Sequence, residues 1–311
     1  MEKEYREFMD ALVEKACLLS EAGGYQIQFQ ENVEIDSEAE DQIMIEFLDQ
    51  EGTPQACAMS AKDFYAKQKQ QGGTPEEGAK QLIREIGRAK DSGLLDMAKK
   101  MRSYEEIKDK LYVRPLNVSD HRIRHAVVRI VGDIALAACI LFQEDEDTCA
   151  SGMIREEFLA HWEMKREQVM DDAMENTMRL APPRIYLWEK LLFDQSYQGE
   201  EFMTSPEEAK EVIRKDCLGN CLSTSKRTNG AVAVFYPGVA RQLSRLVGSD
   251  LFLVFTSIHE AMIHSVRAND PESLKHILAD TMQNTTPEKD ILTERIYRYF
   301  RETDEIRCVT D

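Results

Sequence analysis

The longest apolar run in this sequence, Ile134–Phe142, limits what the chain can build. It is about half as long as a helix must be to cross the ~30 Å hydrocarbon core of a bilayer, so it predicts a buried core segment and no membrane span. The hydrophobic fraction of 42% and the charged fraction of 31% are typical of a folded globular protein. At 311 residues the chain is longer than one hydrophobic core comfortably serves, which favours two domains.

Negative charge is concentrated near the N-terminus. The net charge is −18, and residues 1–60 hold 15 acidic and 3 basic residues, whereas residues 61–110 hold 9 acidic and 12 basic residues. A field of this sign repels phosphate backbones, so nucleic acid is not an expected partner. The acidic block is either a solvated face or a surface for a basic protein partner.

The start of the chain and its cysteines both indicate a cytoplasmic protein. Met1–Glu7 is acidic where a secretory signal needs basic residues followed by an apolar run. The seven cysteines are scattered and odd in number, so we expect reduced thiols. Cys217 and Cys221 are the only close pair, and their spacing favours an incidental pair over a metal site or a disulfide.

Residues 1–110 are expected to form an acidic N-terminal α+β region. Apolar residues at helical spacing over 4–20 stop at Gly23-Gly24, and the alternation that follows at Tyr25–Phe29 indicates a strand. The remaining signals predict a strand at Ile43–Leu48, helices that start near Ser60 and Thr74-Pro75, and helical structure up to about Lys110.

Residues 111–311 are expected to form a C-terminal α+β domain. A hairpin is predicted across the acidic turn Glu144–Thr148, followed by amphipathic helices that end before Pro182-Pro183. The elements expected after that are strand 231–236, helix 239–247, strands 251–255 and 258–266, a helix capped by Asp270-Pro271, and a hairpin over 296–309. This order predicts a mixed sheet, or more than one, flanked by helices, with a β-α-β-β-α-β-like C-terminal part.

One candidate site follows from that order of elements. Strands 231–236 and 251–255, joined by a helix, are expected to run parallel, so the loops Tyr236–Gly238 and Ser257–Glu260 would face each other at one sheet edge. There Tyr236, Ser257, His259 and Glu260 would supply a phenol, a hydroxyl, an imidazole and a carboxylate. The alternative is structural, because Pro-Gly forms turns by itself and Ser, His and Glu often satisfy backbone groups in tight connections.

No other motif indicates a metal or a cofactor. His259 and His264 are five residues apart, which leaves their rings about 140° apart on a helix and on opposite faces of a strand, so they cannot share a zinc ion. The sequence has no Walker loop, no Gly-x-Gly-x-x-Gly motif and no Gly-x-Ser-x-Gly elbow. We therefore expect neither a metal nor a cofactor.

The most basic local cluster is His121–His125. Together with Arg114 and Arg129 it is able to meet an anion. An exposed, solvated patch, or ion pairs with the acidic N-terminus, are the alternative interpretations.

Several segments in the last third have a familiar order and spacing. Val234–Val239, Gly248–Phe252, Ser257–Glu260 and Ile296–Tyr299 resemble a clostridial family of the domain of unknown function 5688 type. Weaker likeness in Ala61–Tyr65, Val118–Arg124 and Ile154–Leu159 extends the resemblance over most of the chain, and the first 60 residues depart from it most. The resemblance implies a bacterial cytoplasmic protein and supplies no chemistry.

Two classes of function follow from these patterns. The first is a non-enzymatic binding protein that contacts a protein partner through its acidic N-terminal region. The second is a small-molecule enzyme of the hydrolase kind, with its site at Tyr236, Ser257, His259 and Glu260.

Overall fold

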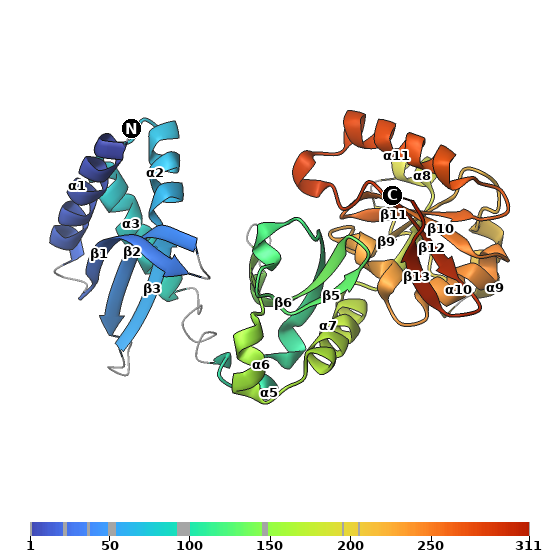
Figure 1. The fold of residues 1–311 in the computed structure, drawn as a ribbon, viewed down its shortest axis with the longest axis horizontal. Helices are drawn as coiled ribbons and strands as arrows, with labels where there is room; N and C mark the ends of the chain where they lie inside the picture. The colour runs from blue at the N-terminus through green and yellow to red at the C-terminus, as the bar shows by residue number, and fades with distance from the viewer. Residues whose placement is uncertain are drawn as a thin grey trace. The chain divides into compact units, whose positions relative to one another are not determined.

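The structure is a computed structural model, and it describes residues 2–20, 24–35, 38–48, 54–91, 100–144, 149–194, 196–204 and 206–310. Helices and separate sheets make an α+β fold (Figure 1), as the sequence predicts. The chain divides into two compact units, Met1–Ala98 and Lys99–Asp311. In the described residues, no helix combines the length and the apolar character that crossing a membrane requires.

The first unit is a three-stranded antiparallel sheet packed with helices. Its elements are α1 (Glu2–Ser20), β1 (Gln26–Ile35), β2 (Glu38–Leu48), β3 (Pro54–Ser60), α2 (Ala61–Gln70) and α3 (Pro75–Asp91), and the strand order is β1-β2-β3. Leu12, Ile43 and Leu82 are fully buried in its core. Ser60 caps α2 by accepting a hydrogen bond from the Asp63 backbone amide at 3.2 Å.

The two faces of this sheet differ in character. Ile27 lies opposite Ile45 on the core side, and both are buried. On the other face Gln28 lies opposite Met44, and Gln28 is exposed. The alternation therefore places apolar side chains inside and glutamines in solvent, as period-two patterning requires.

The second unit contains two sheets, and the smaller comes first in the chain. Its elements are α5 (Tyr104–Ile107), η1 (Lys108–Lys110), β4 (Leu111–Asn117), η2 (His121–Ile123), β5 (Val128–Val131), β6 (Ile134–Glu144), β7 (Cys149–Met153), α6 (Glu156–Trp162) and α7 (Arg166–Leu180). β6 is central and pairs with β4, β5 and β7. The apolar run Ile134–Phe142 is thus a core strand, and the predicted β6–β7 hairpin is confirmed, with its turn at 145–148 outside the described residues.

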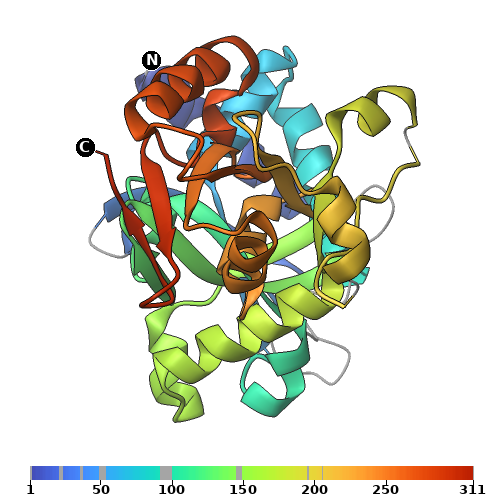
Figure 2. The same ribbon diagram turned by 90° about the vertical axis from the view of Figure 1, so that its right-hand side faces the viewer.

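The larger sheet has six strands in the order β13-β12-β10-β11-β9-β8. Its elements are β8 (Pro183–Tyr186), α8 (Trp188–Phe193), α9 (Pro206–Val212), β9 (Asn220–Thr224), η3 (Gly230–Phe235), α10 (Val239–Val247), β10 (Leu251–Ser257), β11 (Glu260–Ser265), α11 (Pro271–Thr285), η4 (Glu288–Asp290), β12 (Ile296–Phe300) and β13 (Glu305–Cys308). Helix α11 packs on the face that carries Phe252, Val254 and Ile296. Figures 1 and 2 place α10 on the opposite side of the sheet.

The expected parallel β-α-β unit is wrong. Residues 231–236 are not a strand, because Gly230–Phe235 forms a 3₁₀ helix in which the Val232 amide donates to the Asn229 carbonyl oxygen at 3.2 Å. Every strand pairing in the described residues is antiparallel, so the expected mixed sheet is also wrong. A short apolar run that is buried at nearly every position shows no period that distinguishes a strand from a helix, so this segment was predicted wrongly.

Other signals in the last third are confirmed. Gly248 ends α10 with φ of +85°, Asp270 caps α11, and β12 and β13 form the closing hairpin. One turn is displaced: β10 runs on to Ser257, so the chain reverses at Ile258 and His259 and not at 256–257.

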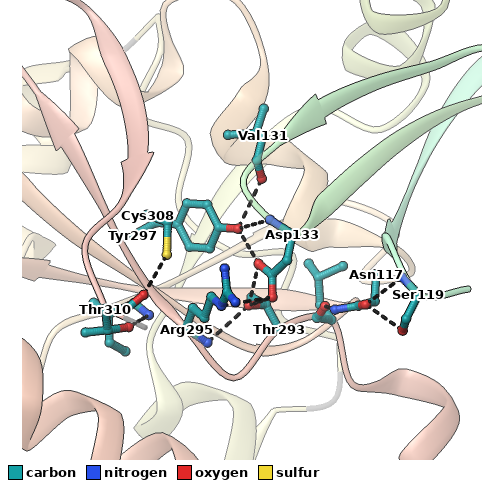
Figure 3. A network of polar contacts seen from close by, with 11 residues as sticks. Asn117, Ser119, Val131, Asp133, Thr293, Arg295, Tyr297, Cys308 and Thr310 are labelled. Atoms are coloured by element: carbon teal, nitrogen blue, oxygen red, sulfur yellow. Dashed lines mark hydrogen bonds and ion pairs between the residues drawn. The ribbon is translucent and has the colours of Figure 1, made fainter.

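A polar network joins the two sheets of the second unit (Figure 3). Asp133 lies in the turn between β5 and β6, and its carboxylate accepts from the Thr293 hydroxyl at 2.8 Å and from the Tyr297 hydroxyl. The Tyr297 oxygen in turn accepts from the Asp133 backbone amide at 2.9 Å. Asn117 adds a bond from its side-chain amide to the Leu292 carbonyl oxygen at 2.9 Å. Segments about 160 residues apart in sequence are therefore held together by directional bonds.

Candidate functional site

Tyr236 is buried, with 2% of its surface exposed. Its hydroxyl donates to the Ala181 carbonyl oxygen at 3.1 Å, and burial raises the pKa of the phenol above its usual value. Tyr236 directly precedes Pro237 and Gly238, and Gly238 begins α10 with φ of +78°. The phenol therefore ties the start of α10 to the end of α7 and stays protonated at neutral pH.

Ser257, His259 and Glu260 lie together at the β10–β11 turn. The Ser257 hydroxyl oxygen accepts from the His259 backbone amide at 3.0 Å, which is a turn-forming bond. Glu260 accepts from the Thr256 hydroxyl at 2.9 Å and from the Cys221 thiol at 3.5 Å. Burial and the nearby Glu260 carboxylate raise the pKa of the Cys221 thiol, so that sulfur stays neutral.

The imidazole of His259 is held on both sides. Its Nδ1 accepts from the Asn229 backbone amide at 3.1 Å, and its Nε2 lies 3.7 Å from the Asp290 carboxylate. Because Nδ1 accepts a bond, the ring proton resides on Nε2, toward Asp290. The Ser257 hydroxyl bonds to the backbone of His259 and not to its ring, so these two residues do not form a nucleophile and base pair in this arrangement.

The expected four-residue site is therefore divided. Three of the residues share the β10–β11 turn, whereas Tyr236 bonds to Ala181 at the end of α7. The loops were expected to meet at the carboxyl ends of two parallel strands. Residues 231–236 are helical, so that pair of parallel strands does not exist. What links the two parts is Asn229, which binds His259 and lies in the wall of a cavity that also contains Tyr236.

This cavity, which we call the central cavity, has a volume of about 440 Å³. It lies among η1, β4, the end of α7 and the connection from β9 to η3. The residues that line it are Asp109, Lys110, Tyr112, Val113, Leu141, Thr177, Leu180, Ala181, Thr224, Lys226, Thr228, Asn229, Val232 and Tyr236. Its volume is in the range of ordinary small-molecule sites, which are largely apolar with a few polar groups.

One polar group in the central cavity has no protein partner. The Thr224 Oγ1 atom is buried and makes no hydrogen bond to the described part of the chain. The neighbouring Thr177 hydroxyl is satisfied, since it accepts from the Val113 amide at 2.8 Å and donates to the Ala173 carbonyl oxygen. A buried hydroxyl without a partner costs free energy.

Sequence reasoning found one wall of this cavity and missed the rest. Tyr236 was a candidate, but Tyr112, Thr177 and Thr224 were not, because each belongs to a segment distant in sequence. No local motif marks them. As for metals, no group of three or more His, Cys, Asp or Glu residues in the described ranges is placed to hold an ion.

Comparisons with known proteins give one match. A protein-family model described as a family of unknown function, DUF5688, matches residues 5–301. This confirms the resemblance seen in Val234–Val239 and the segments that follow it. The curated proteins and the solved structures yielded no match.

Proposed function

The chain belongs to the DUF5688 family, whose description names no activity, and from its own residues we propose that the protein acts by binding and not by catalysis. The environment of His259 supports this proposal. A general base needs a ring nitrogen within reach of the proton it removes, and both nitrogens of His259 face groups of the protein itself. Tyr236 is likewise engaged with a backbone carbonyl oxygen.

The observation that carries the proposal is the central cavity, with its volume of about 440 Å³. Val113, Leu141 and Val232 give it apolar walls. The ligand that fits is a small, mainly apolar molecule. Lys110, also in the lining, suits a negatively charged end on such a molecule.

The test uses the fluorescent probe 1-anilinonaphthalene-8-sulfonate, which has an apolar ring system and one negative charge. We expect saturable binding to the wild-type protein. Thr228→Trp puts a large side chain at an exposed position of the cavity lining and should weaken binding at least about tenfold by occlusion. Gln283→Trp, an exposed position on α11, is the matched control and should bind the probe normally. Equal binding by both variants would rule out the cavity as the site.

A second candidate function is contact with a protein partner through the first unit. Glu7, Asp10 and Glu14 are exposed on α1 and follow one another at helical spacing, so they form one acidic stripe. Lys3 lies 3.7 Å from Glu7, and both side chains are largely exposed, which leaves most of the stripe's charge uncompensated. A basic segment is the complementary partner.

Charge reversal tests the partner proposal. The triple variant Glu7→Lys, Asp10→Lys, Glu14→Lys should lose proteins that the wild-type chain captures from a bacterial lysate at low salt. The control triple reversal, Glu167→Lys, Glu175→Lys and Asp280→Lys, changes three exposed residues of the second unit. A partner that is retained by the α1 variant and lost by the control would contradict the proposal.

We also propose a bacterial, cytoplasmic origin. Six cysteines carry free thiols in the described part of the chain: Cys17, Cys57, Cys139, Cys217, Cys221 and Cys308. Free thiols support a reducing compartment. Thiol titration of the protein immediately after isolation under alkylating conditions tests this. Fewer than six reactive thiols after denaturation would contradict it.

A further inference from the structure

His259 connects the β10–β11 turn to the wall of the central cavity. Its imidazole Nδ1 accepts a hydrogen bond from the Asn229 backbone amide at 3.1 Å, and Asn229 is one of the residues that line the cavity. The two residues are 30 apart in sequence, so the bond joins separate segments of the chain. A titratable side chain therefore holds part of the cavity wall in place.

The backbone of His259 is fixed on both sides, which sets the direction of its ring. Its amide donates to the Ser257 hydroxyl oxygen at 3.0 Å, and its carbonyl oxygen accepts from the Ser223 hydroxyl at 2.7 Å. Gly230 packs so closely against the same carbonyl oxygen that a Cβ there would lie 2.4 Å from it. The Asn229 amide thus keeps its acceptor only while the segment around it stays against this anchored ring.

Asn229 has a backbone conformation that needs support. Its φ of +53° and ψ of +24° lie in the left-handed region, which is unfavourable for a residue other than glycine, although Asn tolerates it better than most. Its carbonyl oxygen accepts from the Val232 amide at 3.2 Å, a bond that begins η3. Thr228 and Val232 also line the central cavity. Loss of the bond to His259 would therefore release a segment that carries three lining residues.

The nearest carboxylate acts on the other nitrogen of the imidazole. Asp290 of η4 lies 3.7 Å from Nε2 of His259. Glu288 and Lys289 belong to the same 3₁₀ turn. Asp290 stabilises a charged ring, because an opposite charge nearby favours the protonated form of His. It does so at Nε2 and leaves Nδ1 to the Asn229 amide.

The other elements around the ring also carry charged groups. Lys226 and Arg227 belong to the connection between β9 and η3; Lys226 has an interaction of its own, and the Arg227 guanidinium lies 5.9 Å from the centre of the Tyr186 ring. Glu260 of β11 accepts from the Thr256 hydroxyl at 2.9 Å. These charges influence the pH at which the ring gains a proton. None of them restores the bond to Asn229, because a protonated Nδ1 has no lone pair left to accept with.

We propose that protonation of His259 loosens this wall of the central cavity, so that ligand binding weakens as the pH falls through the range in which imidazoles titrate, about pH 5 to 8. The proposal rests on the binding function proposed above. The neutral ring accepts the Asn229 amide at Nδ1, whereas the imidazolium carries a proton on both nitrogens, so two N–H groups would face each other. Asp290 remains beside Nε2 in both states, which keeps the charged ring in position while Asn229 loses its acceptor. Because such coupling is reciprocal, a bound ligand would in turn favour the neutral ring.

The test measures the Kd of 1-anilinonaphthalene-8-sulfonate near pH 7.5 and near pH 5.5 at constant ionic strength. The wild-type protein should bind the probe about three- to tenfold more weakly at the lower pH, which is the effect of one neutral hydrogen bond on an equilibrium. His259→Asn places an amide oxygen close to the position of Nδ1 and does not titrate, so its Kd should be the same at both pH values. His276→Asn, an exposed position on α11, is the matched control and should keep the pH dependence of the wild type.

Amide hydrogen exchange of the protein without probe separates this proposal from the binding function. After correction for intrinsic exchange, the segment 226–232 should lose protection at the lower pH in the wild type and not in His259→Asn, while β12 stays protected in both. A complete absence of probe binding would contradict the binding function, and the exchange data would still decide the role of His259. Equal protection of 226–232 at the two pH values would overturn the proposal. So would a wild-type Kd that does not change with pH, or a pH dependence that His259→Asn leaves intact.

Discussion

The Asp133 network makes a quantitative prediction about the second unit. Tyr297→Phe keeps the fully buried ring and removes only its hydroxyl. The Asp133 backbone amide then loses its acceptor, and the Asp133 carboxylate loses one of its donors. The carboxylate keeps the Thr293 hydroxyl, so it is not left alone.

The expected magnitude follows from those two losses. A hydrogen bond to a charged group contributes about 1.5–3 kcal/mol, and an unsatisfied buried amide costs about 1–3 kcal/mol. The two effects overlap, because the local structure relaxes, and we expect the free energy of unfolding to fall by about 2–4 kcal/mol. Tyr299→Phe is the matched control: its hydroxyl donates to Asp304 at 2.6 Å, but that carboxylate is half exposed, so its loss should cost no more than about 1 kcal/mol.

The assay exploits the position of the tryptophans. Both of them, Trp162 and Trp188, belong to the unit Lys99–Asp311, so tryptophan fluorescence during urea denaturation follows that unit alone. The reasoning is refuted if Tyr297→Phe loses no more stability than Tyr299→Phe. A loss under about 1 kcal/mol would show that the network does not stabilise the contact between the two sheets.

Three further variants test particular contacts. A Cβ at Gly230 would lie 2.4 Å from the His259 carbonyl oxygen, so Gly230→Ala should destabilise the second unit by about 1–3 kcal/mol. Gly87→Ala is the control and should not destabilise the first unit, because nothing lies within 4 Å of a Cβ there. Comparable losses of stability in the two variants would refute the steric argument. Burial lowers the pKa of His264, so the unfolded chain takes up a proton first and stability should fall as the pH drops below about 6.5. His264→Phe should flatten that part of the stability curve measured by urea denaturation, and an unchanged slope would contradict the assignment. Thr224→Val removes the unpartnered hydroxyl, so it should leave thermal stability unchanged or raise it; a clear loss of stability would show that the hydroxyl has a partner.

Local signals in the sequence identify most elements. Asp270-Pro271 marks the start of α11 and Gly248 the end of α10, because a capping carboxylate and a positive φ are properties of single positions. The closing hairpin of β12 and β13 was also predicted correctly. Residues 231–236 were predicted wrongly, since burial at nearly every position removes the periodicity that distinguishes a strand from a helix.

The sites depend on pairings that no local signal encodes. The basic cluster at His121–His125 was a candidate for anion contact together with Arg114 and Arg129. The bridge between Ala126 and Arg155 and the ion pair of Arg129 with Asp171 join segments distant in sequence. Likewise Thr224 enters the central cavity only because β9 and β4 belong to different sheets that meet there. Composition and spacing therefore indicated the basic cluster at His121–His125 but did not indicate that Thr224 lines the central cavity.

The sheet of the first unit has a practical consequence for anyone who produces the protein. Its outer strand β3 pairs only with β2 in the described residues and carries no charged side chain from Pro54 to Ser60. A second molecule can add to an uncharged outer strand by backbone hydrogen bonding. Natural sheets often carry lysine on their outer strands, which opposes this association. Ala58→Lys would place a charge on this strand at an exposed position, away from the core. Concentrated samples of that variant should form fibrous aggregates more slowly than the wild-type protein.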